Sequence, residues 1–260
     1  MKWLIAFVVV FSGMTPLLHG ADAPETRPVY VIPIRDEIEE SLVYVVRRGV
    51  KDATARNAQA IILDMDTPGG KVSEVEKIMG LLENFKGNTV TYVNNKAFSG
   101  GAFISVATRH IYMAPTGVIG AAAPVLLGPS GPQELPGTIQ KKMSSALSAL
   151  IRAAAQRNGY NSAVVDAMVK ETDGLTIDGK EIVKKGDILT LTMTEATALY
   201  GKPPKPLLAE GVATDMKDLL KKLGYFESQV HYFKPSGMER IARFITYISP
   251  ILMLIGMGGL

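Results

Sequence analysis

Apolar residues recur along the first half of the chain in a way that predicts alternating strands and helices. Residues 28–34 are apolar and β-branched, which is typical of a strand. In residues 37–56 the apolar positions recur at helical spacing, which predicts an amphipathic helix. The same pair follows twice more, with strands at 60–65 and 89–93 and helices at 73–85 and 102–108. This order favours an α/β fold with a parallel core.

The second half is less regular but carries further helices and short strands. Residues 123–136 are rich in glycine and proline and predict a long irregular loop, a candidate rim of a site. Asp-Gly at the centre of residues 175–182 predicts a hairpin. The remaining elements are short strands at 111–114, 118–119 and 189–192, and helices at 138–158, 163–170, 194–199 and 214–223.

The two ends of the chain differ from the middle because both are apolar. Residues 1–23 combine a lysine, an apolar run and an Ala-Asp-Ala ending, which indicates a secretory signal peptide; an uncleaved anchor helix is the alternative. Residues 238–260 are long enough to span a bilayer, although a docked hydrophobic helix would fit the same pattern. We therefore expect one extracytoplasmic domain over 24–235, tethered to a membrane, in a chain that is a fragment of a longer protein.

Composition and charge exclude several kinds of partner and active site. The chain has 260 residues and a net charge of +3, and its basic residues are scattered, so nucleic acid is not an expected partner. It has no cysteine, which excludes cysteine nucleophiles, disulfides and cysteine-based zinc sites. Three histidines do not cluster, and no metal or cofactor is expected. Asp64 and Asp66 alternate at a strand end, where capping of the strand is favoured over metal binding or acid–base work.

A Ser-Gly-Gly turn at Ser99 carries the strongest chemical signal. It joins the predicted strand at 89–93 to the helix at 102–108, so the serine would be exposed at a helix N-terminus. Free backbone N–H groups and the helix dipole favour developing negative charge there. The stretch resembles the Gly-x-Ser-x-Gly elbow of serine hydrolases, with Ala97 in place of the first glycine. The alternative is an ordinary turn with no catalytic role.

A nucleophilic serine needs a base, and a lysine fits better than a histidine. His110 lies at the far end of the helix that Ser99 begins, roughly 15 Å away. Lys142 shares a small apolar face of the helix at 138–158 with Ala146, Ala149 and Ala153. Its neighbour Lys141 lies on a polar face. We therefore expect Lys142 to be buried with a lowered pKa, so that the neutral amine can accept a proton; snorkelling to solvent is the alternative.

Acyl transfer also requires donors for the oxyanion. Residues 66–70, Asp-Thr-Pro-Gly-Gly, follow a buried strand, and ligand sites form at the carboxyl ends of parallel strands. The backbone N–H groups of Gly70 and Gly100 are therefore candidates to converge on one oxygen atom.

Taken together, these segments resemble a known family. Asp-Thr-Pro-Gly-Gly at 66–70, Ser-Gly-Gly at 99–101, the segments 113–121 and 185–196, and a lysine-bearing helix resemble the NfeD-type membrane-bound serine proteases of the ClpP class. These are partners of stomatin-like proteins and relatives of signal peptide peptidase A. The resemblance implies a ClpP/crotonase fold, a Ser99–Lys142 dyad and an oxyanion glycine at Gly70. Phe98 before the serine and Ala123 in place of a histidine depart from the family pattern.

The resulting prediction is a membrane-associated endopeptidase that cleaves apolar peptide segments, with a stomatin-like membrane protein as the candidate substrate, and that could form homo-oligomers. Gly69, Phe98 and Val125 are predicted to contact the substrate, with 125–132 helping to form an apolar groove. Two alternatives remain open. One is an enzyme of the crotonase type acting on acyl-CoA, and the other is a non-catalytic scaffold that binds a stomatin-like protein.

Overall fold

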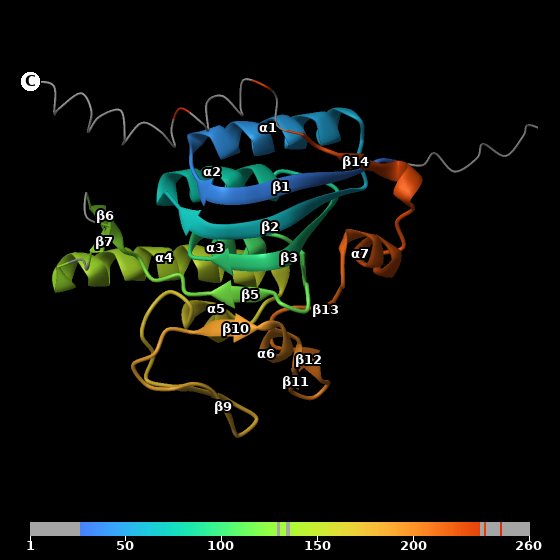
Figure 1. Cartoon of the computed structure of the whole chain (residues 1–260). Coiled ribbons are helices and arrows are strands. Elements are labelled where there is room, and N and C mark those ends of the chain that lie inside the picture. Colours follow the sequence, from blue (N-terminus) through green and yellow to red (C-terminus); the bar gives the residue numbers. More distant parts are fainter. Residues whose placement is uncertain (1–26, 129–130, 134–135, 235–236, 238–244, 246–260) are drawn as a thin grey trace, which may run out of the picture.

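A computed structural model describes residues 27–128, 131–133, 136–234, 237 and 245. Its centre is a mixed sheet with the strand order β10-β5-β3-β2-β1-β14, and β4 also pairs with β3 (Figure 1). The central strands β1 (Val29–Ile38), β2 (Ala60–Gly70) and β3 (Asn88–Phe98) run parallel. The predicted α/β fold with a parallel core is confirmed at this level.

Helices connect these strands as expected for a parallel sheet, in which a crossover must return the chain to the same edge. They are α1 (Glu40–Ala55), α2 (Val72–Glu83) and α3 (Gly100–Val106). Alternate residues along β1 and β2 divide between two apolar clusters, one on each face of the sheet. The larger cluster lies against these helices and α4 (Gly137–Asn158), and the smaller one against α7 (Met216–Lys222).

The remaining elements are short. Strands are β4 (His110–Met113), β5 (Val118–Gly120), β6 (Leu126–Gly128), β7 (Gly131–Gln133), β8 (Leu175–Ile177), β9 (Lys180–Val183), β10 (Thr190–Thr192), β11 (Leu199–Tyr200), β12 (Lys205–Pro206), β13 (Gly211–Val212) and β14 (Val230–Tyr232). Helices are α5 (Ser162–Asp166), α6 (Met193–Thr197) and a 3-10 turn at Glu227–Gln229.

Two segments differ from the sequence prediction. Residues 66–70, which the sequence predicts as a loop after the strand at 60–65, instead continue β2, because β1 and β2 stay paired past a bulge, with Glu37 opposite Gly69 and Ile38 opposite Gly70. The Gly/Pro-rich stretch 123–136 is not wholly irregular, since it contains the β6–β7 hairpin. Glycine and proline favour a turn from the local sequence, but pairing with β1 keeps residues 66–70 in an extended strand.

The predicted signal peptide at 1–23 lies outside the described residues, as does the predicted membrane segment at 238–260 except for Ile245. Over the described ranges, no helix is both long and apolar enough to cross a bilayer.

Candidate active site

Ser99 lies at the junction of β3 and α3, in a backbone conformation that few residues other than glycine adopt. Its φ is 51° and its ψ is −120°. Such a conformation costs on the order of 1–3 kcal/mol and persists only where neighbouring structure imposes it. Here the Ser99 N–H donates to the carbonyl of Gly120 at 3.0 Å, and the Ser99 carbonyl accepts from the N–H of Ala102 at 3.0 Å. The turn that the sequence predicts is therefore a strained elbow that presents the Ser99 side chain.

Two glycines at this elbow, Gly69 and Gly100, leave no room for a side chain. A Cβ on Gly69 would lie 2.5 Å from the Ser99 Cβ and 2.9 Å from its Oγ. A Cβ on Gly100 would lie 2.4 Å from Val75 and 3.7 Å from the backbone nitrogen of Gly70. The end of β2 and the start of α3 are thus in direct contact, and the Gly70 and Gly100 backbones lie next to each other beside the serine.

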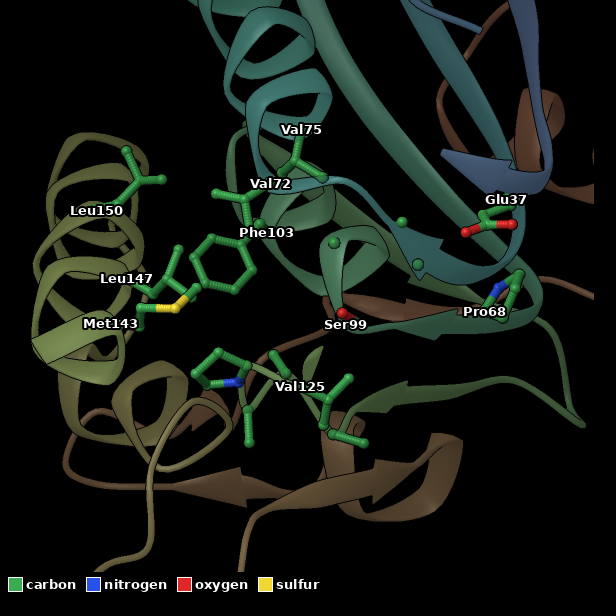
Figure 2. A pocket seen from close by; sticks show the side chains of 17 residues that line it. Glu37, Pro68, Val72, Val75, Ser99, Phe103, Val125, Met143, Leu147 and Leu150 are labelled. Carbon is green, nitrogen blue, oxygen red and sulfur yellow. The ribbon is translucent and has the colours of Figure 1, made fainter. Parts of the chain in front are cut away.

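Ser99 opens into a cavity of about 400 Å³. Glycine and apolar residues supply most of its wall, and Glu37 is the one charged residue among the described residues that line it. Figure 2 shows that the larger apolar side chains gather on one side of Ser99, whereas Glu37 and Pro68 lie on the other. The apolar wall consists of Val72, Val75, Phe103, Met143, Leu147 and Leu150.

The cavity brings together most, but not all, of the residues predicted from the sequence. Ser99, Gly69, Gly70, Gly100 and Val125 all line it. Phe98, in contrast, is only partly buried and does not line the cavity. The sequence pattern did not identify Glu37 or the apolar wall as parts of a site, although Met143, Leu147 and Leu150 recur at helical spacing within residues 138–158.

The lysines do not follow the predicted arrangement. Lys142 is exposed and does not line the Ser99 cavity, so its expected burial is wrong for the described chain. Lys141 is also exposed, and it lines a second cavity, of about 480 Å³, with Ser148 and Arg152. The α4 helix turns the face with the larger side chains Leu147 and Leu150 toward Ser99, since burying them removes more apolar area from water than burying alanines would.

The two aspartates, Asp64 and Asp66, lie within β2 and have structural partners. Asp64 forms an ion pair with Arg35 and accepts a hydrogen bond from Asn94 at 3.0 Å. Asp66 accepts from Asn95 at 3.2 Å. Among the described residues, no group of acidic or histidine side chains is placed to hold a metal ion.

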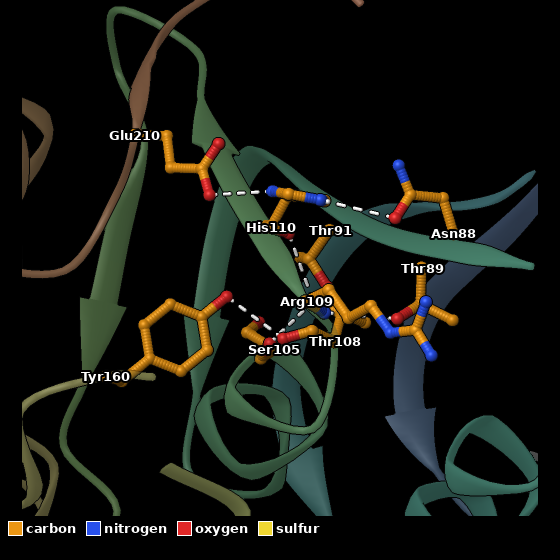
Figure 3. Close-up of polar contacts among 9 residues, drawn as sticks. All are labelled: Asn88, Thr89, Thr91, Ser105, Thr108, Arg109, His110, Tyr160 and Glu210. Carbon is orange, nitrogen blue, oxygen red and sulfur yellow. Dashed lines mark hydrogen bonds and ion pairs between the residues drawn. The ribbon is translucent and has the colours of Figure 1, made fainter. Parts of the chain in front are cut away.

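His110 belongs to a separate polar network at the opposite end of α3 (Figure 3). Its Nδ1 lies 2.7 Å from a carboxylate oxygen of Glu210, and its Nε2 lies 3.2 Å from the side-chain oxygen of Asn88. Nearby, the hydroxyl of the partly buried Tyr160 donates to the carbonyl of Thr108 at 2.9 Å, and burial raises the pKa of Tyr160. These contacts join β4, α3 and the segment after α4, which indicates a structural role.

Comparison with known proteins places this geometry in a family. A family model for the N-terminal domain of NfeD1b matches residues 28–233. The chain belongs to the NfeD1b N-terminal domain family. Membrane protein NfeD1b of Bacillus subtilis is 36% identical over 239 residues, which are 91% of this chain and 51% of that protein. Membrane-bound protease PH1510 of Pyrococcus horikoshii is 26% identical over 276 residues, covering 98% of this chain and 55% of that protein. The chain thus spans about half the length of these curated relatives.

Solved structures of the N-terminal domain of the P. horikoshii protease resemble this NfeD1b-type fold. A lysine-to-alanine mutant of that stomatin-specific protease, in complex with a substrate peptide, matches with a TM-score of 0.66 at 27% identity. The match covers 85% of this chain and 98% of the solved one. A serine-to-alanine mutant matches with a TM-score of 0.63 at 27% identity, over 81% of this chain and 99% of the other. Both relatives named above are described as membrane proteins.

Proposed function

We propose that this chain is a membrane-associated serine endopeptidase of the ClpP/crotonase type, with its domain outside the cytoplasm. The observation that carries the proposal is the strained elbow at Ser99, which opens into a peptide-sized apolar cavity beside two adjacent glycine backbones. Similarity to a membrane-bound protease, whose serine and lysine mutants have been solved, supports the same reaction class.

In the proposed reaction, the Ser99 Oγ attacks the carbonyl carbon of the scissile peptide bond and forms a tetrahedral intermediate. The carbonyl oxygen takes up negative charge, and the N–H groups of Gly70 and Gly100 stabilise it. Preorganised donors of this kind contribute about 3–4 kcal/mol each to transition-state stabilisation. Lys142 accepts the Ser99 proton and returns it to the leaving amine, which makes the amine a good leaving group. Water then hydrolyses the acyl-enzyme.

Lys142 must approach Ser99 for this chemistry. It precedes Met143, which lines the Ser99 cavity, so the two residues are separated by about 100° around α4. Turning the N-terminal part of α4 by one residue position would direct Lys142 toward the cavity. The three residues on either side of Lys142, from Ile139 to Ser145, are exposed or only partly buried, so little packing opposes this movement.

The substrate that this site fits best is an extended apolar segment of a protein. The apolar wall of the cavity accommodates a large aliphatic or aromatic side chain, and Gly69 and Val125 lie where the adjoining backbone would pass. By similarity to a stomatin-specific protease, we propose a stomatin-like membrane protein as the physiological substrate.

Peptide hydrolysis by four forms of the full chain tests the proposal. Ser99→Ala and Lys142→Ala should each abolish turnover, whereas Lys141→Ala, the matched control on the same helix turn, should retain it. Full activity in the Lys142 variant together with loss of activity in the Lys141 variant would show that Lys141, and not Lys142, is the base. Full activity in the Ser99 variant would refute the mechanism.

A non-catalytic scaffold is the second candidate, because Lys142 is exposed and lies outside the cavity. The same apolar cavity would then bind a segment of a stomatin-like protein without cleaving it. Binding of apolar peptides by the wild type, with no product formed at any pH and the same affinity in Ser99→Ala, would favour the scaffold over the protease.

A further inference from the structure

Glu37 is a charged side chain in a cavity whose other described lining residues carry no charge. It lies near the end of β1, where Ile38 is fully buried and Glu37 is exposed. An exposed glutamate on a surface loop would need no explanation. A glutamate in the wall of an apolar binding cavity repels anionic ligands and favours cations, so its position bears on what the cavity accepts.

The sheet register shows how close Glu37 is to the serine. Glu37 is paired with Gly69 across the β1–β2 ladder, and neighbouring strands lie about 4.8 Å apart. Gly69 in turn contacts Ser99, since a Cβ on this glycine would lie 2.5 Å from the Ser99 Cβ. Only Gly69 therefore lies between the backbone of Glu37 and the nucleophile, a separation that three residues of an extended peptide can span.

Glu37 and the apolar wall lie on opposite sides of Ser99 (Figure 2). A peptide whose scissile bond is above Ser99 has side chains on both sides of that bond. If one of them enters the apolar wall formed by Phe103, Met143 and Leu147, the chain on the other side of the bond passes Glu37.

We propose that Glu37 is a specificity-determining residue that selects a basic side chain, lysine or arginine, across the scissile bond from an apolar one. This inference rests on the proposed peptidase function for the position of the scissile bond, whereas binding of the basic side chain does not depend on cleavage. Lysine and arginine are the side chains that match a lone carboxylate, and both also have aliphatic stems that suit a largely apolar cavity.

Binding to the inactive full chain separates this proposal from the proposed function. All variants carry Ser99→Ala, so no turnover is needed. Fluorescent peptides with acetylated and amidated ends contain one leucine followed by lysine, glutamine or glutamate. The lysine peptide should bind about two- to fivefold more tightly than the glutamine peptide, the ratio expected for one partly exposed ion pair, and the preference should weaken with salt.

Substitution of Glu37 should change the preference in a set direction. Glu37→Gln should bring the lysine-to-glutamine affinity ratio to about one, and Glu37→Lys should make the glutamate peptide the tightest of the three. Glu40→Gln removes a nearby exposed carboxylate that does not line the cavity, and it should keep the wild-type ratio. A circular dichroism spectrum that matches the parent shows that each variant is folded.

Two outcomes would overturn the assignment. One is an unchanged ratio in Glu37→Gln, and the other is equal affinity of the parent for the lysine and glutamine peptides. Binding with the expected preference but without cleavage by the wild type would leave this inference standing and refute the peptidase proposal. Cleavage without any charge preference would support the peptidase proposal and refute the role of Glu37.

Discussion

Replacing Gly69 with alanine should disable Ser99 without changing a group that takes part in the chemistry. The added methyl carbon would lie 2.5 Å from the Ser99 Cβ, 2.9 Å from its Oγ and 3.1 Å from the Phe98 carbonyl oxygen. Non-bonded carbon atoms are most stable about 3.5–4.0 Å apart, so Ser99 must retreat by about 1 Å. A displacement of this size at a reacting atom costs roughly 100-fold in rate.

The substitution also affects stability. Gly69 has a φ of +109°, which an alanine adopts only at a cost of about 1–3 kcal/mol. We therefore expect Gly69→Ala to lower the free energy of unfolding by at least that amount, because the steric overlap adds to the backbone term. Denaturant unfolding followed by circular dichroism measures this change, and peptide hydrolysis under folding conditions measures the rate.

Gly80→Ala is the matched control. Gly80 lies inside α2, where a Cβ would meet no atom within 4 Å. Alanine is favoured over glycine in a helix interior, so this variant should be stabilised by about 0.5–1 kcal/mol and keep full activity. Wild-type hydrolysis by Gly69→Ala, or equal stability of the two variants, would refute the account of a crowded elbow at Ser99.

Two further predictions concern the support around the site. Tyr160→Phe removes the hydroxyl that donates to the Thr108 carbonyl and should lower the free energy of unfolding by about 1–2 kcal/mol in denaturant titrations; no loss would show that water replaces the bond. Burial of Asp166 raises its pKa, but the ion pairs with Lys170 and Arg152 outweigh that effect and leave the pKa below its ordinary value. A carboxyl with a lowered pKa in the folded state stabilises the protein above the pKa of the unfolded chain, about 3.9, and this stability is lost as the pH falls through the lower folded value. Melting temperatures measured from pH 6 to pH 2 should therefore fall less steeply for Asp166→Asn than for the wild type, and parallel curves would contradict the assignment.

The sequence predicted the parts of this fold that local pattern controls. Strand and helix periodicity located β1, β2, β3 and the helices between them. The elbow at Ser99 and the proximity of Gly70 to Gly100 also followed, because the carboxyl ends of neighbouring parallel strands meet at one edge of a sheet.

What the sequence could not predict depends on contacts between distant segments. Helical spacing shows which residues share a face of α4, but not which face packs against α3. The face with the larger side chains packs there, and Lys142 is left exposed. Pairing of β14 with β1 joins residues about 200 positions apart, such as Val29 and Val230, and no local signal reports it. The place of Glu37 in the cavity depends likewise on its register with Gly69.

The nucleophilic character of Ser99 is the central claim, and covalent labelling measures it most directly. The full chain is treated with a fluorophosphonate probe in detergent, digested, and analysed by mass spectrometry. The account predicts a single adduct on the peptide that contains Ser99, absent from Ser99→Ala and strongly reduced in Lys142→Ala but not in Lys141→Ala. An adduct on another serine, or equal labelling of the wild type and Ser99→Ala, would contradict it.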